Sequence, residues 1–346
     1  MTDKALNIAI VGATGAVGRV ALQLLAERKH PAGRIVALAS ARSEGKKLPY
    51  LGGELTVREA KPDLFAGVDV AFISASSKVS KLLAPEAVKW GALVIDDGSA
   101  FRMEPHVPLV VPEVNGQDVA WHRGIISIPN CTTTPLTMVL AALRSLSPIE
   151  RVTVATYQAV SGTGAAAQAE LTEQSRTVLA GQPLRAAVYP HQIAFNVLPQ
   201  VDDFEPDGYT IEEHKMVNET RKILHQPGLP LSATCVRVPI QVSHSESVQV
   251  EFQSAVSAGD ARDALGSFPG ITVLDDPADR VYPMPQLAAG RDEVLVGRIR
   301  KDMSHPNGLV LWLSCDNLRK GAALNALQIM DEVVRRKCLK PAVLKV

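Results

Sequence analysis

The sequence predicts an α/β protein with an N-terminal domain built on a parallel sheet and a second domain of α+β type. Strands and helices alternate over residues 1–128, as they do in parallel sheets covered by helices on both faces. Later strands alternate apolar and polar positions, which is typical of a sheet packed on one side. A chain of 346 residues is long enough for about two domains of roughly 150 residues each.

The first domain begins with a β-turn-α-β unit. Residues 5–11 form an apolar run that predicts a buried strand, and a glycine-rich turn follows. Residues 20–29 carry apolar side chains three and four apart, which predicts a helix, and residues 34–40 predict the second strand. Further elements are expected along this domain, namely strands over 68–74, 93–96 and 109–111 and a helix over 79–90.

The pattern changes near residue 128. Pro129 breaks a strand over 125–128, and Pro135 helps to start a helix over 135–143. Strands of the second domain are expected over 151–157, 248–252 and 309–313. The expected boundaries are 1–128 for the first domain, 129–316 for the second, and 317–346 for a C-terminal segment whose helix (322–335) returns to the first domain.

The composition excludes several classes of function. The net charge is zero, with 36 basic and 36 acidic residues, so neither nucleic acid nor an anionic membrane is expected as a partner. No apolar run approaches the roughly 20 residues that span a bilayer, and residues 1–4 do not start a secretory leader, so a cytoplasmic protein is expected. The cysteines form no Cys-x-x-Cys pair and the histidines no His-Glu-x-x-His motif, so no protein-bound metal is expected.

The turn after the first strand carries Gly12, Gly15 and Gly18 in a G-x-x-G-x-x-G pattern. Glycine lets the backbone approach a pyrophosphate, while the N-terminus of the following helix offers free N–H groups and a partial positive charge. The position between a strand and a helix favours a dinucleotide site and therefore a Rossmann-like first domain. The alternative is a turn whose glycines have only a steric role.

The end of the second strand indicates the type of dinucleotide. NAD sites usually place Asp or Glu about 20 residues beyond the glycines to bind the ribose 2′-hydroxyl. This chain has no acid there before Glu44, and it places Arg42 between the hydroxyl-bearing Ser40 and Ser43. Such a group suits a 2′-phosphate, so NADP is favoured over NAD. The alternative is that Arg42 is a solvated loop residue.

Cys131 is the candidate nucleophile. It follows a strand and lies at the start of a helix, where free N–H groups and the helix dipole stabilise a thiolate. The three threonines that follow it can cap the same turn. The alternative, a small buried cysteine, describes Cys235, Cys315 and Cys338 better.

A nucleophilic cysteine needs a partner that handles protons, and His244 is the candidate. Arg237 stands in an apolar strand, where a cation requires an anion, and a substrate carboxylate bound bidentately would serve. Seven residues of ideal strand would place the two side chains on opposite faces, so the chain must bend between them.

Three other positions carry polar side chains where a ligand can bind. Residues 157–164 end a strand and open a helix, and there Gln158 can orient an acyl oxygen; the alternative is a plain strand-to-helix turn. Glu212 and Lys215 share one face of a helix, although most such pairs are solvated surface charges. Arg102 follows a strand end, where open α/β sheets bind ligands.

Taken together, these motifs resemble aspartate-β-semialdehyde dehydrogenase across nearly the whole chain. The matching segments keep their order and spacing, and they are 10–18, 99–102, 127–134, 157–164, 212–215, 237–244 and 314–317. The short segment between Lys215 and Arg237 resembles the compact form of the family.

The resemblance implies a role for each residue. Cys131 would be the acyl-accepting nucleophile, His244 the acid/base catalyst, and Gln158 the residue that positions the acyl intermediate. Among the substrate-binding residues, Arg237 would hold the α-carboxylate, Glu212 the ammonium, and Arg102 and Lys215 the phosphate, with Asn130 beside them. The residues expected to touch NADP are Thr14, Gly15, Ala16, Val17, Arg42, Ser43, Ser161, Gly162 and Asn317.

The family reaction is the NADPH-dependent conversion of β-aspartyl phosphate to aspartate semialdehyde and inorganic phosphate, in the biosynthesis of lysine, diaminopimelate, threonine, methionine and isoleucine. The family also implies a homodimer or a dimer of dimers, joined through the second domain. One alternative is an N-acetyl-γ-glutamyl-phosphate reductase, whose blocked amine needs no acidic residue such as Glu212. A glyceraldehyde-phosphate dehydrogenase-like enzyme is disfavoured by Arg42. A non-catalytic relative is disfavoured by the joint presence of Cys131, Gln158, Arg237 and His244.

Overall fold

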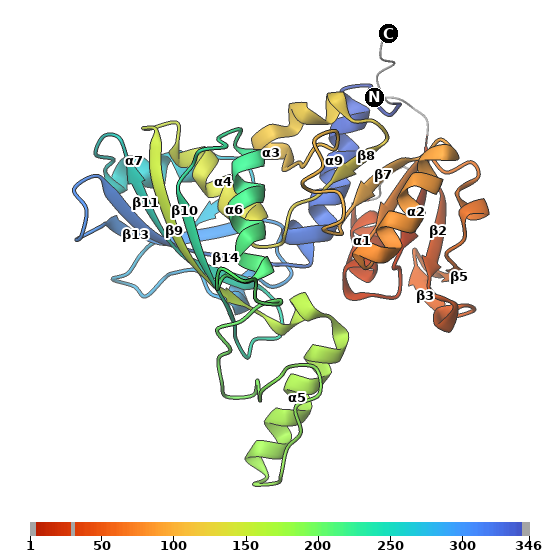
Figure 1. Cartoon of the computed structure of the whole chain (residues 1–346), viewed down its shortest axis with the longest axis horizontal. Coiled ribbons are helices and arrows are strands. Elements are labelled where there is room, and N and C mark those ends of the chain that lie inside the picture. Colours follow the sequence, from red (N-terminus) through yellow and green to blue (C-terminus); the bar gives the residue numbers. More distant parts are fainter. Residues whose placement is uncertain (1–4, 29–31, 341–346) are drawn as a thin grey trace. The chain divides into compact units, whose positions relative to one another are not determined.

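A computed structural model describes residues 5–28 and 32–340, and the N-terminal residues 1–4 considered above lie outside it. The chain forms two compact units, labelled along the chain in Figure 1. The first comprises the described residues within Met1–Asn130 and Ala322–Val346, and the second comprises Cys131–Gly321. The α/β fold class that the sequence predicts is confirmed.

The first unit is built on a sheet of six parallel strands in the order β5-β2-β1-β6-β7-β8. Their bounds are β5 Arg58–Glu59, β2 Ala32–Ala39, β1 Leu6–Val11, β6 Val70–Ile73, β7 Leu93–Asp96 and β8 Ile125–Ser127. The larger helices of this unit are α1 Ala16–Glu27, α2 Ser77–Lys89 and α9 Leu324–Arg335.

Both faces of this sheet are covered because its strands are apolar on both sides. In β1, Ile8 and Ile10 contribute to a core with α1 and α9, whereas Ala9 and Val11 contribute to a separate core with α2. This alternation places helices on both sides of the sheet. The glycine-rich turn therefore lies at the carboxyl end of a central strand, where α/β sheets bind ligands.

The prediction of a strand over residues 109–111 was wrong. Only Leu109 forms a bridge, to Ser127, and Val111 already precedes the short helix α3 (Pro112–Asn115). The side chain of Asn115 accepts a hydrogen bond from the backbone N–H of Val111 and donates one to the carbonyl of Leu109. An asparagine side chain thus satisfies the backbone groups that a neighbouring strand would otherwise pair. The hairpin of β3 (Lys47–Tyr50) and β4 (Gly53–Thr56) was not expected either.

The second unit is built on a mixed six-stranded sheet in the order β10-β9-β11-β14-β13-β12. Their bounds are β10 Leu231–Arg237, β9 Ile149–Gln158, β11 His244–Phe252, β14 Gly308–Cys315, β13 Val294–Lys301 and β12 Ile271–Val273. The helices of this unit are α4 Thr133–Leu143, α5 Ala165–Leu179, α6 Ile211–Ile223, α7 Ala258–Ser267 and α8 Pro285–Ala288. Helix α6 packs against β10, α7 against β12 and β13, and α4 between α6 and α7.

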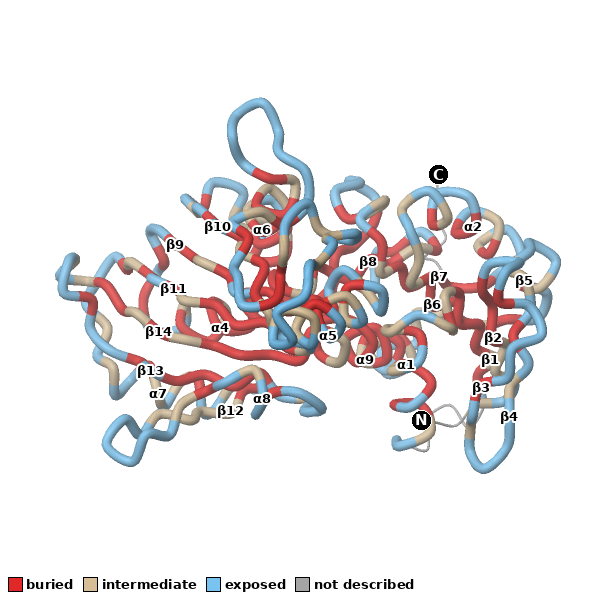
Figure 2. Tube along the Cα trace, turned by 90° about the horizontal axis from the view of Figure 1, so that it is seen from below, coloured by how far each residue is buried: buried red, intermediate tan, exposed pale blue. Residues whose placement is uncertain are grey.

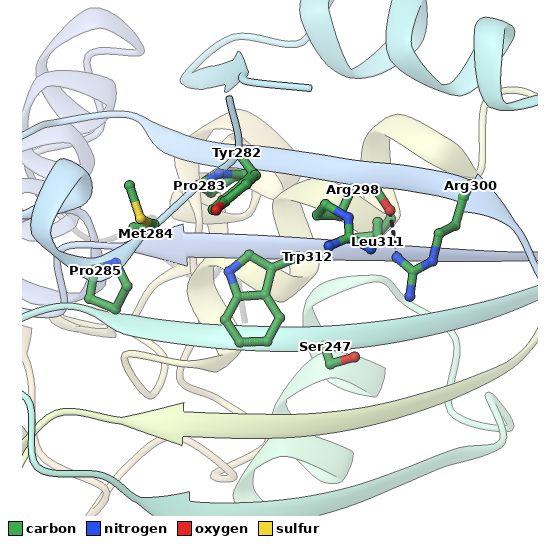
Figure 3. A pocket seen from close by; sticks show the side chains of 9 residues that line it. All are labelled: Ser247, Tyr282, Pro283, Met284, Pro285, Arg298, Arg300, Leu311 and Trp312. Atoms are coloured by element: carbon green, nitrogen blue, oxygen red, sulfur yellow. Dashed lines mark hydrogen bonds between the residues drawn. The ribbon is translucent and has the colours of Figure 1, made fainter. Parts of the chain in front are cut away.

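The other face of the second sheet carries partly exposed aromatic residues. Tyr157 of β9 and Trp312 of β14 lie on this face, with their ring centroids 5.0 Å apart. A hollow of about 290 Å³ lies over β11, β13 and β14, with Ser247, Trp312 and Arg298 among the side chains that line it (Figure 3). Strands β9, β11 and β14 are nevertheless largely buried in the burial view, because their opposite face carries the core (Figure 2).

No helix among the described residues is long and apolar enough to cross a membrane. Nor do these residues contain a group of three or more His, Cys, Asp or Glu side chains that could hold a metal ion.

Candidate active site

The glycine-rich turn of the first unit depends on glycine for two distinct reasons. Gly12 has a φ of +88°, and a Cβ there would lie 2.0 Å from the carbonyl oxygen of Ser74. A Cβ on Gly18 would lie 2.3 Å from the carbonyl oxygen of Gly12, so these two glycines are required by packing. Gly15, in contrast, is exposed at the start of α1 and leaves the N–H groups of the helix N-terminus accessible. The steric alternative and a ligand-binding turn are therefore both compatible with this geometry.

The residues expected to select the dinucleotide lie beside this turn. Arg42 is exposed in a single 3-10 turn, Ala41–Ser43, that directly follows β2. Ser43 is buried, and its hydroxyl accepts a hydrogen bond of 3.4 Å from the hydroxyl of Thr14. An accessible guanidinium and hydroxyl groups are thus grouped at the carboxyl end of β1 and β2, as a phosphorylated ribose requires.

Arg102 is held at the end of β7 in the same unit. Its guanidinium donates a hydrogen bond of 2.7 Å to the carbonyl of Asp97, and its side chain is buried. Burial raises the pKa of the neighbouring Asp96 to about 6, while the charge of Arg102 acts in the opposite direction. Asn130, the last residue of this part of the unit, is also buried.

In the second unit, four chemically active side chains meet at one end of the sheet. Gln158 and Arg237 are the last residues of the parallel strands β9 and β10, and they are register partners. His244 is the first residue of the antiparallel strand β11, and Cys315, the last residue of β14, is its partner. The chain leaves the strand after Arg237 and re-enters the sheet on the far side of β9, which confirms that it must bend between Arg237 and His244.

The backbone of a single residue, Ala159, orients both Arg237 and His244, through the two peptide groups that flank its Cα. The N–H of Ala159 donates a hydrogen bond of 2.9 Å to Nδ1 of His244. The carbonyl of Ala159 accepts a bond of 2.7 Å from the guanidinium of Arg237. Because Nδ1 is an acceptor, the proton of the neutral imidazole is on Nε2. Burial, and secondarily the charge of Arg237, lower the pKa of His244 well below its usual value.

Arg237 and His244 converge on the backbone of Gly162. A Cβ on this exposed glycine would lie 3.1 Å from a terminal nitrogen of Arg237 and 3.3 Å from Nε2 of His244. Neither the Nε2 of His244 nor the Nε of Arg237 has a hydrogen-bond partner among the described residues, although both atoms are buried. Each of the two side chains therefore keeps one buried donor that the described residues do not use, and the one on His244 lies close to exposed Gly162.

Cys131 is partly exposed, whereas Cys315 is buried. A Cβ on Gly321 would come within 3.0 Å of the Cβ of Cys131, so glycine is needed at that position for close packing. Burial is the main cause that raises the pKa of Cys315, and the neighbouring Cys131 adds to the effect. Cys315 is in turn the strand partner of His244.

Glu212 and Lys215 form a polar network with Gln158 rather than a solvated surface pair. Glu212 is buried, and one of its oxygens accepts a hydrogen bond of 3.2 Å from the side-chain amide of Gln158. Its other oxygen lies 3.1 Å from Nζ of Lys215. A capping box formed by Thr210 and Glu213 starts α6, the helix that carries both residues, and fixes its first turn.

Ser161 and Asn317 are joined by a hydrogen bond. The side-chain oxygen of Asn317 accepts bonds of 2.9 Å from the hydroxyl of Ser161 and from the backbone N–H of Ser243. Ser243 has a φ of +78° and directly precedes His244. Asn317 thus stabilises the turn that brings His244 into the sheet, a role that its position in the sequence did not indicate.

Two residues of this site were missed in the sequence. The ring of Tyr189 lies 6.0 Å from the guanidinium carbon of Arg237, and its hydroxyl donates a hydrogen bond of 2.9 Å to Thr163. Asp202 lies 2.7 Å from Nζ of Lys215. Tyr189, Asp202 and Arg237 line one cavity of about 400 Å³. The segment that carries Tyr189 and Asp202 has no regular pattern, so only the tertiary structure reveals their positions.

Two family models match the chain. The model of the semialdehyde dehydrogenase NAD binding domain matches residues 7–122, and the model of the semialdehyde dehydrogenase dimerisation domain matches residues 140–320.

Individual relatives agree with these matches. The aspartate-semialdehyde dehydrogenase of Bacillus subtilis (strain 168) is 48% identical over 95% of this chain and 98% of that protein. The aspartate-semialdehyde dehydrogenase of Aquifex aeolicus (strain VF5) is 49% identical over 95% of this chain and 98% of that protein. The crystal structure of aspartate semialdehyde dehydrogenase II of Vibrio cholerae, complexed with ASA, is 42% identical and has a TM-score of 0.94 over 96% of this chain and 99% of that one.

A more distant structure, that of the Candida albicans aspartate semialdehyde dehydrogenase with NADP, is 28% identical and has a TM-score of 0.76. The superposition covers 96% of this chain and 99% of the Candida albicans chain. The chain belongs to the aspartate-semialdehyde dehydrogenase family.

Proposed function

We propose that the protein reduces β-aspartyl phosphate to aspartate semialdehyde and inorganic phosphate, with NADPH as the reductant and a thioester on Cys131 as the intermediate. The observation that supports this most directly is the convergence of Arg237 and His244 on exposed Gly162, in the unit that also contains Cys131. The reaction would serve the biosynthesis of lysine, diaminopimelate, threonine, methionine and isoleucine, and we expect it in the cytoplasm.

The first step is the attack of the Cys131 thiolate on the acyl carbon of β-aspartyl phosphate. A carbon–sulfur bond forms, the carbon–oxygen bond to the phosphate breaks, and phosphate leaves with a proton taken from solvent. Cys131 precedes Thr132, the N-cap residue of α4, and the first N–H groups of this helix favour an anion nearby. The thioester is a better hydride acceptor than a carboxylate, which is the reason for covalent catalysis.

The second step reduces the thioester, and the bound nicotinamide supplies the hydride. The resulting alkoxide collapses to the aldehyde and expels the Cys131 thiolate. His244 presents its Nε2–H to this reacting group, where a hydrogen bond stabilises the alkoxide and the departing sulfur. To accept a proton on Nε2, His244 would first have to carry its own proton on Nδ1 instead. In the structure, Nδ1 accepts a hydrogen bond from the N–H of Ala159.

The remaining residues recognise the substrate. Arg237 would bind the α-carboxylate, Glu212 the ammonium, and Gln158 the acyl oxygen, because these side chains are buried and oriented at one end of the sheet. Lys215 would bind the phosphate, together with Arg102 and Asn130 of the first unit.

An assay tests the whole proposal. The protein should reduce NADP when aspartate semialdehyde and inorganic phosphate are both present, and activity should disappear when phosphate is omitted. Activity with N-acetyl-γ-glutamyl semialdehyde in place of aspartate semialdehyde would support the alternative reductase. Inactivity with every aldehyde tested would support a non-catalytic relative.

The cofactor preference depends on Arg42. The crowded Gly12, the exposed Gly15 and the linked hydroxyls of Thr14 and Ser43 fit a dinucleotide phosphate, and we infer NADP from the exposed guanidinium beside them. The other proposed contacts of the cofactor are Ser161, Gly162 and Asn317 of the second unit and Ala16, Val17 and Ser40 of the first.

Replacing Arg42 by alanine should raise KM for NADP about tenfold or more, because a hydrogen-bonded charge pair is lost.

The control measurement is KM for NAD. In Arg42→Ala it should stay within about twofold of the value for the unchanged protein, because NAD has no 2′-phosphate. Equal changes in the two KM values would show that Arg42 does not select the cofactor.

We also propose a homodimer, or a dimer of dimers, that is formed through the face of the second sheet with Tyr157 and Trp312. The family's dimerisation-domain model covers this sheet, and aromatic residues are typical of subunit contacts.

Trp312→Glu should shift the protein toward monomers in sedimentation experiments, because a charge would be buried in the contact. Trp121→Glu, at an exposed tryptophan of the first unit, is the control, and equal behaviour of the two variants would argue against this face.

A further inference from the structure

Lys215 is shared by two carboxylates. Its Nζ lies 2.7 Å from Asp202 and 3.1 Å from Glu212, and only 21% of its side chain is exposed. Burial acts to lower the pKa of Lys215, but the charges and hydrogen bonds of Glu212 and Asp202 outweigh it and raise that pKa. The ammonium proposed for phosphate binding is thus already paired with two negative charges.

Asp202 is held in this position by the surrounding backbone. Its φ is +68°, and one carboxylate oxygen accepts a hydrogen bond of 3.0 Å from the N–H of Asp203. On one side of it, Leu198 pairs with Arg237 through two backbone hydrogen bonds, of 2.9 and 2.8 Å. On the other side, the carbonyl of Asp203 accepts a bond from Ile211, the first residue of α6. Although 37% of its side chain is exposed, the carboxylate of Asp202 is therefore held beside Lys215 by its own contacts and by the surrounding backbone.

The electrostatics of Asp202 are consistent with a lasting ion pair. Burial acts to raise its pKa, but the hydrogen bond and charge of Lys215, with a contribution from Arg237, hold the pKa below its usual value. Asp202 is thus an anion throughout the neutral range. An incoming phosphate is also an anion, so it must compete with Asp202 for Lys215.

We propose that Asp202 controls the affinity of the site for phosphate, because its carboxylate competes with phosphate for the ammonium of Lys215. The proposal rests on the proposed function, in which Glu212 is engaged by the substrate ammonium and Lys215 by the phosphate. In the reductive direction Asp202 re-forms its ion pair with Lys215 as phosphate departs, and so promotes product release. Asp202 is a positioning residue, since it acts through Lys215.

The test is Asp202→Asn, assayed in the oxidative direction with saturating aspartate semialdehyde and NADP and varied inorganic phosphate. Asparagine tolerates the left-handed backbone at this position and can still accept the hydrogen bond from Asp203. KM for phosphate should fall about fivefold or more, which is the effect of one unit charge at about 4 Å in water. The decrease should shrink as ionic strength rises. General damage to the fold does not improve affinity for one substrate.

Asp203→Asn is the matched control, because it removes the same charge one residue further along from an exposed side chain. Its KM for phosphate should stay close to that of the unchanged protein. A KM for phosphate that is unchanged or higher in Asp202→Asn would overturn the proposal, provided that the unchanged protein shows phosphate-dependent activity.

Calorimetric titration with inorganic phosphate separates this proposal from the proposed function. If the unchanged protein oxidises no aspartate semialdehyde, the proposed function fails, and the titration still tests Asp202. Tighter phosphate binding by Asp202→Asn than by Asp203→Asn supports control by Asp202. Equal binding by the two variants contradicts it.

Discussion

Cys131→Ala should reduce the phosphate-dependent oxidation of aspartate semialdehyde by about 10⁴-fold or more, as loss of a covalent nucleophile does in other enzymes. Without the thiolate no thioester can form, and neither His244 nor Arg237 can replace it, because both present N–H donors. The side chain is small and partly exposed, so the fold should be retained. Steady-state rates, circular dichroism and a titration of NADP binding check the three parts of this result.

Cys235→Ala is the control for the loss of a thiol. Cys235 is buried in β10, and burial raises its pKa, which makes it a poor nucleophile. Its sulfur packs 3.7 Å from that of Met216, so its loss should lower the stability of the fold by about 1 kcal/mol and leave turnover intact. Turnover close to that of the unchanged protein in Cys131→Ala would rule out the thioester mechanism.

His244→Asn should reduce kcat by about 10² to 10⁴-fold, the range for loss of an acid/base group or of a donor to the reacting oxygen. KM for aspartate semialdehyde should change less, because the proposed carboxylate contact belongs to Arg237. The control is His122→Asn in the first unit, whose imidazole hydrogen-bonds to the carbonyl of Cys338. A kcat for His244→Asn within threefold of the unchanged protein would show that this imidazole is not used.

The pH dependence of kcat provides a second test of His244. Because burial and Arg237 lower its pKa well below the usual histidine value, the ring should stay neutral as pH falls through about 6.5, and kcat should show no loss there that is due to this residue. Stability should behave differently. An unfolded histidine binds a proton as pH falls through about 6.5 whereas the folded one does not, so His244 lowers the stability of the fold below that pH. An acid limb of kcat near pH 6.5 that disappears in His244→Asn would contradict the neutral ring.

The features that the sequence predicted well are local. The glycine turn, the strand and helix around Cys131, and the helix that carries Glu212 and Lys215 each depend on neighbouring residues, and the structure contains all of them. The apolar run at 109–111 was misassigned because a side chain, Asn115, supplies the hydrogen bonds that the pattern assigned to a strand.

The convergence of Arg237 and His244 could not be derived from spacing. Strand β9 separates the strands that carry them, and the order of strands in a sheet is a tertiary property. The contribution of Ala159 is made by its backbone N–H and carbonyl, which have no sequence signature. Asp202 could not be recognised either, because its role depends on a backbone turn that brings an ordinary loop carboxylate to Lys215.

The backbone of Ala159 has a consequence for attempts to change the preferred substrate. The peptide group before its Cα orients the imidazole through its nitrogen, and the peptide group after its Cα orients the guanidinium through its oxygen. A redesign that replaces Arg237, in order to accept an aldehyde without a carboxylate, removes one of the two contacts that hold this residue in place. The imidazole would then depend on a less constrained donor, so selectivity and turnover at this centre are coupled.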